Sequence, residues 1–484
     1  MKQGGRILRA LLALGALFLP LAAGAAEAQQ YDLVIANGRV IDPESGLDAV
    51  RNVGIVKDRI AAVSDKPLDG REVVDAKGLV VAPGFIDLHA HGQNLPSQTY
   101  QVRDGVTTAL ELEGGIHPLP PALAAREGKA LINYGYSAGY GDIRVLVKDK
   151  DLKRAFHEEA TAEERARIFA LVEEDIANGA MGIGLPLDYL SRGVNEAELE
   201  GLFRIAARHK MPLFIHIRMS DDASDPSGFA ELIEMSRRTG APFHMVHIVS
   251  TGLQRVPLYL EMMEKARADG LDVTTELYPY TAGSTGINSG IFDHDWQRKF
   301  GVSYDAIEWP PTGERFRDKA MWDEYRAKYP DGTIIIHAMK EEWVEQALRH
   351  PGVMIASDGM PIERLDERAH PRGMGTFSRV LGHYVREKKV ISLADAISRM
   401  TLLPAKRLES FTPAMKRKGR ISVGADADVT IFDPERVIDK ATFAEPNQFA
   451  EGIAHVLVGG QFVVRDGDLV PDSFPGRPIS TRSQ

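Results

Sequence analysis

Helix-like and strand-like segments alternate through the middle of the chain, and this alternation constrains the fold more than any other feature. Thr161 and Glu164 have the spacing of a helix capping box, and the amphipathic run that follows ends at Asn178-Gly179. Strand-like runs at 181–185, 212–216, 242–247 and 272–278 are separated by helical patterns at 195–210, 229–239 and 258–268. Such repeats predict a parallel sheet. We expect an α/β fold with an eight-stranded (βα)8 TIM barrel. An open doubly wound sheet is the alternative, and no glycine-rich nucleotide-binding turn supports it.

The two ends of the chain have a different, all-β texture. Short apolar runs separated by turns such as Asn37-Gly38 and Lys77-Gly78 fill residues 31–83, and similar runs return at 427–464. We therefore expect residues 29–83 and 413–484 to form one small β-sandwich. The barrel would then occupy 84–412, with an insertion at about 283–330 over its mouth. The run from Thr333 to His337 is expected to be barrel strand seven.

The N-terminus has the layout of a secretory signal peptide over residues 1–28. Lys2, Arg6 and Arg9 precede an apolar run at 10–21, and small residues follow. Cleavage is expected after Ala28, with Ala25 as the second choice. An uncleaved membrane anchor is the alternative, but the apolar run is shorter than the roughly 20 residues that span a bilayer. We expect export to a bacterial periplasm and no stable membrane insertion after cleavage.

Composition narrows the range of partners. The chain has 484 residues and no cysteine, so disulfides are excluded and a large apolar core must stabilise the exported protein. The net charge of −10 argues against nucleic acid, since phosphate binding needs a basic face. A small-molecule substrate is expected, and an oligomer is compatible with the composition.

Six side chains that can bind metal each stand where a predicted strand ends. They are His89, His91, Glu113, His216, His247 and Asp358. Barrel enzymes carry their chemistry at the carboxyl ends of the strands, so these side chains are expected to converge there. Imidazole nitrogens and carboxylate oxygens are zinc ligands. The pattern predicts a catalytic centre that binds one or two Zn²⁺ ions.

The carboxylate after the second predicted strand has two candidates. Glu111 and Glu113 both face inward, and two acids inside a barrel would be costly without a cation. Two metals held side by side need a bridging anion, and the strands predicted at 131–140 and 181–185 contain no lysine to supply one. Glu113 lies nearer the rim and is the first choice, while Glu111 stays open as the second.

Asp358 has two expected roles. It can ligate a metal, and it can take a proton from water and pass it to a leaving amine. Because a metal lowers the pKa of bound water, attack by metal-bound hydroxide needs no serine or cysteine nucleophile. Asp358 is therefore the predicted catalytic residue.

Several motifs resemble the amidohydrolase superfamily, and within it the D-aminoacylase (N-acyl-D-amino-acid deacylase) family. The matching segments cover nearly the whole chain after the signal peptide: 32–42, 83–91, 105–108, 278–285, 357–359, 370–382 and 418–433. The segment from His370 to Phe377 (His-Pro-Arg-Gly-Met-Gly-Thr-Phe) is specific to this branch. The resemblance implies hydrolysis of the amide bond in N-acyl amino acids, with the D form expected.

The resemblance also implies a substrate-binding set. In this family an arginine and nearby tyrosines hold the substrate carboxylate; here Arg372, Tyr189 and one of Tyr278 or Tyr280 match them. A guanidinium suits this role because it can make two parallel hydrogen bonds to a carboxylate. Strand position alone makes His337 a further candidate for substrate contact, or else a core histidine.

Two departures from the family pattern concern the substrate and the metal. D-aminoacylases usually carry a cysteine ligand after strand two, where this chain has Glu113 or Glu111. They also carry a lysine just after the strand-six histidine, where this chain has Ile248-Val-Ser-Thr251. A dipeptidase, a cyclic-amide hydrolase or a lactonase on the same centre is therefore the alternative activity. A catalytically silent binding protein is the alternative from another class.

Overall fold

The computed structural model describes residues 30–190, 193–222, 224–293 and 295–483. The predicted signal peptide falls on residues 1–28 and lies outside this range. None of the described helices is both long and apolar enough to cross a membrane.

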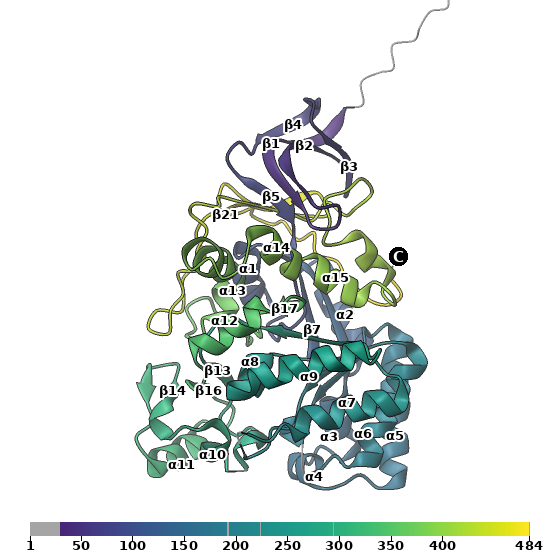
Figure 1. Cartoon of the computed structure of the whole chain (residues 1–484), viewed down its shortest axis with the longest axis vertical. Coiled ribbons are helices and arrows are strands. Elements are labelled where there is room, and N and C mark those ends of the chain that lie inside the picture. The colour runs from purple at the N-terminus through teal and green to yellow at the C-terminus, as the bar shows by residue number, and fades with distance from the viewer. Residues whose placement is uncertain (1–29, 191–192, 223, 294, 484) are drawn as a thin grey trace, which may run out of the picture.

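Eight parallel strands form the central barrel (Figure 1). In ring order they are β6 (Phe85–Asp87), β7 (Val106–Ile116), β8 (Asn133–Gly139), β9 (Ile183–Pro186), β10 (Leu213–His216), β11 (Phe243–Met245), β12 (Val273–Leu277) and β17 (Val353–Ile355). The bridge between Ala90 and Gly359 joins the first strand to the last, and the Asp358 amide donates to the His89 carbonyl at 2.8 Å. The expected barrel is confirmed, and its closing seam lies beside the predicted metal ligands.

Helices surround the barrel in the order that the alternation predicts. Those before the insertion are α1 (Leu95–Arg103), α2 (Leu119–Arg126), α3 (Tyr140–Val147), α4 (Leu152–His157), α5 (Ala162–Asn178), η1 (Leu187–Leu190), α6 (Glu196–His209), α7 (Ser227–Thr239), α8 (Ile248–Gly252), η2 (Leu253–Arg255) and α9 (Val256–Ala268). Those after it are α12 (Glu341–Arg349), α13 (Arg372–Arg379), η5 (Val380–Glu387), α14 (Leu393–Met400), α15 (Leu402–Leu408) and η6 (Pro413–Arg417). The predicted capping box at Thr161 and Glu164 is present at the start of α5.

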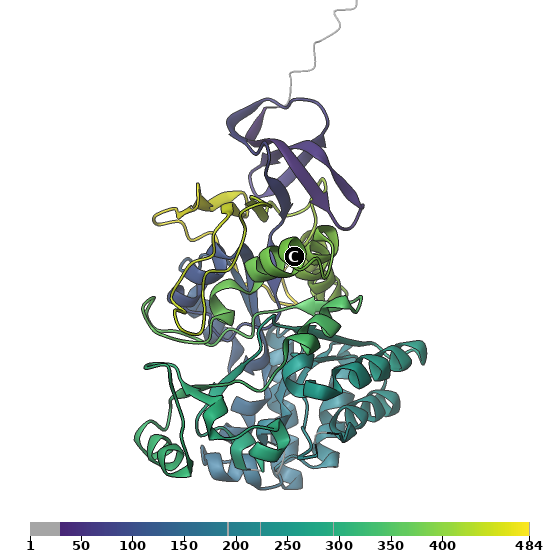
Figure 2. The same cartoon turned by 60° about the vertical axis from the view of Figure 1, so that its left-hand side comes forward.

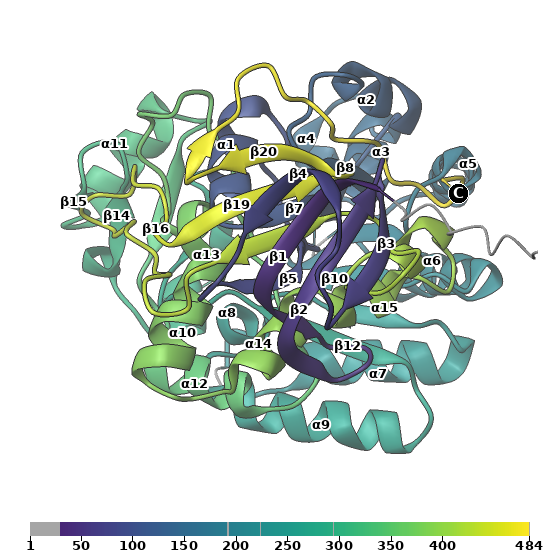
Figure 3. The same cartoon turned by 90° about the horizontal axis from the view of Figure 1, so that it is seen from above.

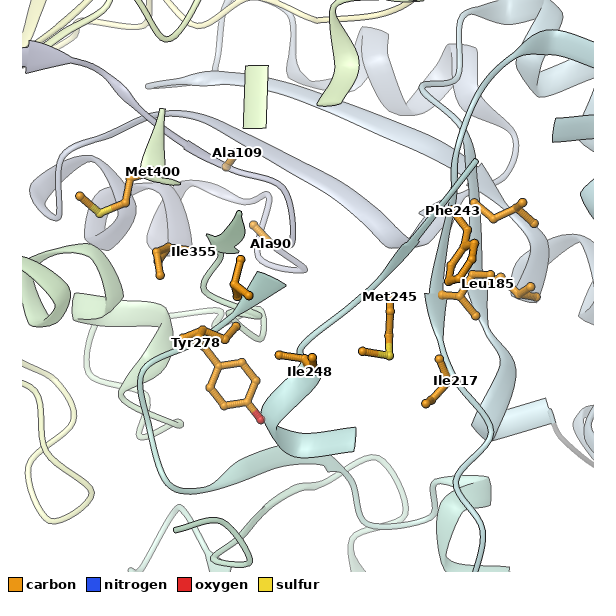
Figure 4. Close-up of a cluster of buried hydrophobic side chains, with 14 of the residues drawn as sticks. Ala90, Ala109, Leu185, Ile217, Phe243, Met245, Ile248, Tyr278, Ile355 and Met400 are labelled. Atoms are coloured by element: carbon orange, nitrogen blue, oxygen red, sulfur yellow. The ribbon is translucent and has the colours of Figure 1, made fainter. Parts of the chain in front are cut away.

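Alternate side chains of the barrel strands point outward and pack against the surrounding helices, as Phe243 does against Phe203 of α6 and Phe229 of α7. Phe243 and Met245 are completely buried on β11, and Figure 4 shows them beside Leu185 and Ile217. Tyr278 lies further along the same core and is 3% exposed. The core thus reaches the strand ends where the candidate site lies.

Strands from both ends of the chain, purple and yellow in Figure 3, join one nine-stranded sheet that is distinct from the barrel sheet. It comprises β1 (Tyr31–Asp42), β2 (Leu47–Val56), β3 (Arg59–Ser64), β4 (Gly70–Asp75), β5 (Val80–Pro83), β18 (Val429–Phe432), β19 (Ile453–Val458), β20 (Gln461–Arg465) and β21 (Asp468–Leu469). The long strand β1 pairs first with β4 and then with β5, and β5 pairs with β18. The prediction that the two ends form one β domain is confirmed.

An inserted four-stranded sheet follows β12 and projects beside the barrel (Figure 2). Its elements are β13 (Gly283–Gly286), η3 (Gly290–Asp293), α10 (Trp296–Phe300), η4 (Tyr304–Ala306), β14 (Ile307–Trp309), β15 (Glu314–Arg315), α11 (Lys319–Lys328) and β16 (Thr333–Ile336). The insertion has its own aromatic core, which includes Trp296, Trp309 and Trp322.

The prediction that residues 333–337 form barrel strand seven is wrong. β16 pairs antiparallel with β13 and β14, so it belongs to the inserted sheet, and β12 is the seventh barrel strand. An apolar run buried in either sheet has the same sequence pattern, so periodicity could not distinguish the two.

A buried ion pair fixes the helices on one side of the barrel mouth. The Arg144 guanidinium on α3 is fully buried and pairs with Glu198 on α6. Its Nε donates to the Ala155 carbonyl of α4 at 2.7 Å.

Removing one partner of a buried pair leaves an uncompensated charge. We expect Glu198→Ala to lower the free energy of unfolding by about 3–5 kcal/mol in denaturant titration. Glu196→Ala, which removes an exposed carboxylate from the same helix, should cost at most about 1 kcal/mol.

Candidate metal centre and substrate cavity

The structure brings all six predicted metal ligands together at the carboxyl rim. His89 and His91 follow β6, Glu113 lies on β7, and His216 ends β10. His247 follows β11 and Asp358 follows β17. Both His247 and Asp358 adopt positive φ, at 34° and 52°. Backbone strain of this kind persists where the surroundings require it and clusters at functional sites.

Glu113 lies at the middle of the group. Its Oε2 is 3.0 Å from His89 Nε2 and 3.2 Å from His91 Nε2. Its Oε1 is 3.0 Å from His216 Nδ1 and 3.6 Å from His247 Nε2. One carboxylate therefore faces two pairs of histidines with its two oxygens, and it would be a shared ligand if two cations were bound.

Asp358 closes one side of this group. Its Oδ1 lies 3.4 Å from His89 Nε2 and 3.3 Å from His91 Nε2. Its Oδ2 accepts a hydrogen bond from Arg372 Nη1 at 2.8 Å. Burial opposes ionisation of Asp358, but the Arg372 cation and His89 outweigh it and lower the Asp358 pKa. The carboxylate is therefore ionised at neutral pH.

Two further acids, Glu276 and Glu111, contact the Nδ1 atoms of His89 and His91 and so orient these imidazoles. Glu276 Oε1 lies 3.1 Å from His89 Nδ1 and accepts the His247 amide at 2.8 Å. Glu111 Oε2 lies 2.6 Å from His91 Nδ1. A carboxylate on one ring nitrogen leaves the other free for a metal. The structure places Glu113 among the histidines, and Glu111 beside His91 Nδ1.

The charges of the group favour a cation. Burial disfavours the imidazolium form of His89, yet the Asp358 and Glu113 carboxylates raise the His89 pKa well above its usual value. Burial would raise the pKa of Glu113, but His89 and His216 lower it well below its usual range. The structure thus stabilises positive charge between these groups, and a divalent cation can take the place of the protons.

The donor set fits zinc. Three groups have ligand atoms within 4.8 Å of one another: His89, His247 and Asp358; His89, His91 and Glu113; and Glu113, His216 and His247. His247 Nδ1 is buried and has no hydrogen-bond partner among the described residues. Imidazole and carboxylate are ordinary zinc ligands, and the groups share members as a two-ion centre does. The residues present therefore fit the predicted cofactor.

Glu276 should contribute to metal affinity without touching the ion. We expect Glu276→Gln to weaken zinc binding about 10- to 100-fold. The neutral glutamine side chain would replace the charged acceptor that now faces His89 Nδ1 and the backbone N–H of His247. A competition titration with a chromogenic chelator measures this. Glu308→Gln, whose carboxylate also faces a histidine at 2.9 Å but lies in the insertion, should leave the affinity unchanged. Equal affinities for the two variants would contradict the orienting role of Glu276.

A cavity of about 1400 Å³ opens over this group. Its wall includes His91, Glu113, His216, His247 and Asp358. Arg372, Tyr278 and Tyr189, the residues that the family resemblance singled out, also line it. The Arg372 guanidinium lies 4.5 Å from the centre of the Tyr278 ring, and its Nε has no partner among the described residues. Burial raises the pKa of Tyr278 to about 12, so its hydroxyl remains protonated.

Two predicted substrate contacts lie outside this cavity. The Tyr280 hydroxyl donates to Asp439 at 3.3 Å, so Tyr278 alone of this tyrosine pair lines the cavity. His337 follows β16 in the insertion, and its Nε2 lies 2.9 Å from Glu308. The sequence left the choice between Tyr278 and Tyr280 open, because both belong to one motif beyond the end of β12, and the structure places Tyr278 on the cavity wall. His337 is wrongly placed because β16 is not a barrel strand.

Sequence reasoning missed three charged residues at the site. Glu276 on β12 was overlooked because it lies between Thr275 and Leu277 and so lacks the two apolar neighbours that singled out Glu111. Asp188 follows β9, and its Oδ2 lies 4.0 Å from His216 Nε2. The same oxygen accepts a hydrogen bond from Lys299 Nζ at 2.5 Å, and Lys299 lies in the insertion. No sequence pattern relates Asp188 to Lys299.

The fold and the site together define a class: a (βα)8 barrel enzyme with four histidines and two carboxylates at the strand ends. The protein-family model named Amidohydrolase family matches residues 72–141 and 333–464. An N-acyl-D-glutamate deacylase of Alcaligenes xylosoxydans xylosoxydans is 33% identical, and the alignment covers 93% of this chain and 96% of that protein. A D-aminoacylase of the same organism is 32% identical over 90% of this chain and 94% of its own.

Solved structures agree with the sequence comparison. The crystal structure of N-acyl-D-glutamate deacylase from Bordetella bronchiseptica, complexed with zinc and a phosphonate inhibitor, superposes with a TM-score of 0.80 and 28% identity. It covers 93% of this chain and all of that one. The chain belongs to the amidohydrolase family and is a hydrolytic enzyme related to the D-aminoacylases. The family predicted from the sequence motifs is confirmed.

Proposed function

We propose that this protein hydrolyses the amide bond of N-acyl-D-amino acids with zinc held by His89, His91, Glu113, His216, His247 and Asp358. The observation that carries the substrate assignment is the position of Arg372. Its buried guanidinium lies on the cavity wall and contacts Asp358 at 2.8 Å, so a carboxylate bound to Arg372 places the neighbouring amide over the metal ligands. The related proteins are named for N-acyl-D-glutamate and N-acyl-D-aspartate deacylation and D-aminoacylase activity, which supports the D configuration.

The residues divide the chemistry among them. Zinc, when bound, polarises the amide carbonyl and lowers the pKa of water. Asp358 accepts the proton from the attacking water and donates it to the amine nitrogen as the C–N bond breaks. Arg372 orients Asp358 through Oδ2 and leaves its Oδ1 toward the site. Tyr278 and Tyr189 supply neutral hydroxyl groups on the cavity wall, since burial raises the pKa of both.

Paired D and L substrates test this proposal. Zinc-loaded protein is incubated with N-acyl derivatives of the same amino acid in both configurations, and the free amine is measured. Release from the D form alone is the expected result. The segment after β11 places Ser250 and Thr251 on the cavity wall instead of the lysine usual in the family. Release from L forms, or only from dipeptides or lactones, would show that this departure changed the substrate and would overturn the proposal.

Arg372 should distinguish acids from their neutral analogues. A charged hydrogen-bonding pair contributes about 1.5–3 kcal/mol, which is about 10- to 100-fold in binding. We expect Arg372→Lys to lower the kcat/KM ratio between an N-acyl amino acid and its carboxamide by that factor, because a point charge cannot replace the planar fork. Arg368→Lys is the matched control, since its guanidinium binds backbone carbonyls at 310 and 444. An unchanged ratio in Arg372→Lys would show that the substrate carboxylate lies elsewhere.

We also propose export, on the basis of residues 1–28. Their basic start, apolar run and small-residue end support a cleaved signal peptide. Mass spectrometry of the protein recovered from a bacterial periplasmic fraction tests this, and an intact Met1 there would contradict it.

A further inference from the structure

The cavity over the metal ligands is polar at one end and apolar at the other. Metal ligands, Arg372, Tyr278 and Ser284 form the polar end. Beyond them the wall is made by aliphatic and aromatic side chains from α3, α4, η1, η3 and α10: Val145, Leu146, Leu152, Phe156, Leu190, Ile291 and Phe300. The helices of this end are joined, because α4 packs against η1 and η1 packs against η3. The volume of about 1400 Å³ exceeds the roughly 300–1000 Å³ typical of pockets for drug-sized ligands.

Ring order in the barrel places the two ends on opposite sides. β8 is the third strand and leads into α3 and α4, while β12 is the seventh and leads to Tyr278. Strands four places apart in a ring of eight face each other. In an N-acyl amino acid the acyl group and the carboxylate-bearing carbon lie on opposite sides of the amide. A substrate whose carboxylate binds Arg372 therefore directs its acyl chain toward α3 and α4.

Two leucines of the apolar end are exposed beyond what folding requires. Leu146 is 37% exposed and Leu152 is 57% exposed, and both line the cavity. Large apolar side chains in a concave, solvent-open wall that continues an active site are typical of a ligand-binding groove. Arg144 fixes the backbones of both helices, so this wall is formed before any ligand binds. Among the residues that the structure describes, the charged side chains in this part of the wall are Asp142 and Lys150, at exposed positions.

We infer that this apolar end binds the acyl chain, and that the substrates are N-acyl amino acids with medium-length to long hydrocarbon acyl groups. This inference rests on the proposed function and names the part of its substrate that the metal centre does not specify. An acetyl group would leave the wall at α3 and α4 in water. Each buried methylene contributes favourably to binding, so the chain length of the acyl group becomes a specificity determinant.

An acyl series tests the inference. Acetyl, butanoyl, hexanoyl and octanoyl derivatives of one amino acid are compared, using the amino acid and configuration that the paired assay identifies. We expect kcat/KM to rise about two- to fourfold per methylene, which is at least about 60-fold over the roughly six methylenes between acetyl and octanoyl. Leu146→Gln should lower the octanoyl-to-acetyl ratio of kcat/KM at least threefold. Leu258→Gln on α9, at 38% exposure and outside the cavity wall, should keep the wild-type ratio.

The outcomes separate this inference from the proposed function. Equal kcat/KM for acetyl and octanoyl substrates would overturn the acyl assignment while leaving deacylation established. A rise with chain length that Leu146→Gln and Leu258→Gln alter equally would place the acyl chain elsewhere and also overturn it. No amine release at any chain length would overturn the proposed function and this inference with it.

Discussion

Replacing Asp358 with asparagine is expected to lower kcat by about 100- to 10,000-fold. Asparagine has nearly the same shape, and its carbonyl oxygen can still accept from Arg372. It cannot take a proton from water or deliver one to the leaving amine. The loss should appear in kcat with metal content held constant, so steady-state kinetics on zinc-loaded protein, together with a zinc assay, measures it.

Asp439→Asn is the matched control for this substitution. The Asp439 side chain is only 5% exposed and also pairs with an arginine, Arg379, at 3.1 Å, but it lies outside the cavity wall. It should keep near wild-type kcat. Full activity in Asp358→Asn would exclude this residue as the proton carrier, and a pH profile that keeps its acidic limb would lead to the same conclusion.

Glu113→Gln is expected to weaken zinc binding more than about 100-fold, beyond the 10- to 100-fold typical of residues that only orient a ligand. Glu113 faces His89, His91, His216 and His247, so its loss removes the carboxylate that all four histidines contact. Glu113→Cys should recover much of the affinity, because a thiolate is a zinc ligand. Zinc titration by calorimetry, with protein at equal folded fraction by circular dichroism, compares the variants.

Glu111→Gln is the control that distinguishes the two acids of β7. Glu111 contacts His91 Nδ1 from behind, so its loss should cost less than the loss of Glu113. A larger effect at Glu111 than at Glu113, or a cysteine variant no better than glutamine, would contradict the bridging position of Glu113.

The sequence predicts the barrel and the metal group well for a definite physical reason. Parallel strands end at a common rim, so His216, His247 and Asp358 on separate strands must converge whatever the details of packing. His89 and His91 share a side by simple alternation. The apolar residues Ala109, Leu110 and Leu112 of the same strand likewise mark Glu113 as an inward acid that needs a cation. These inferences need only the periodicity within short segments and the rule that the parallel strands of a barrel end at one rim.

Other features depend on contacts that short segments do not encode. The strand Thr333–Ile336 has the same apolar pattern in either sheet, and only its partners β13 and β14 assign it to the insertion. His337 is misplaced for that reason. Lys299 comes from the insertion to meet Asp188, 111 residues away in the chain. Residue pairs so far apart in the chain produce no regular spacing in the sequence. The contact between the insertion and the barrel could therefore be found only from the structure.

Activity as a function of added zinc tests the central claim most directly. The protein is stripped with a chelator, confirmed as folded, and titrated with zinc while amine release from an N-acyl-D-amino acid is followed. We predict no release from the stripped protein and recovery within the first one or two equivalents per chain. Full activity in the stripped protein, or none at any zinc level, would contradict hydrolysis at this centre.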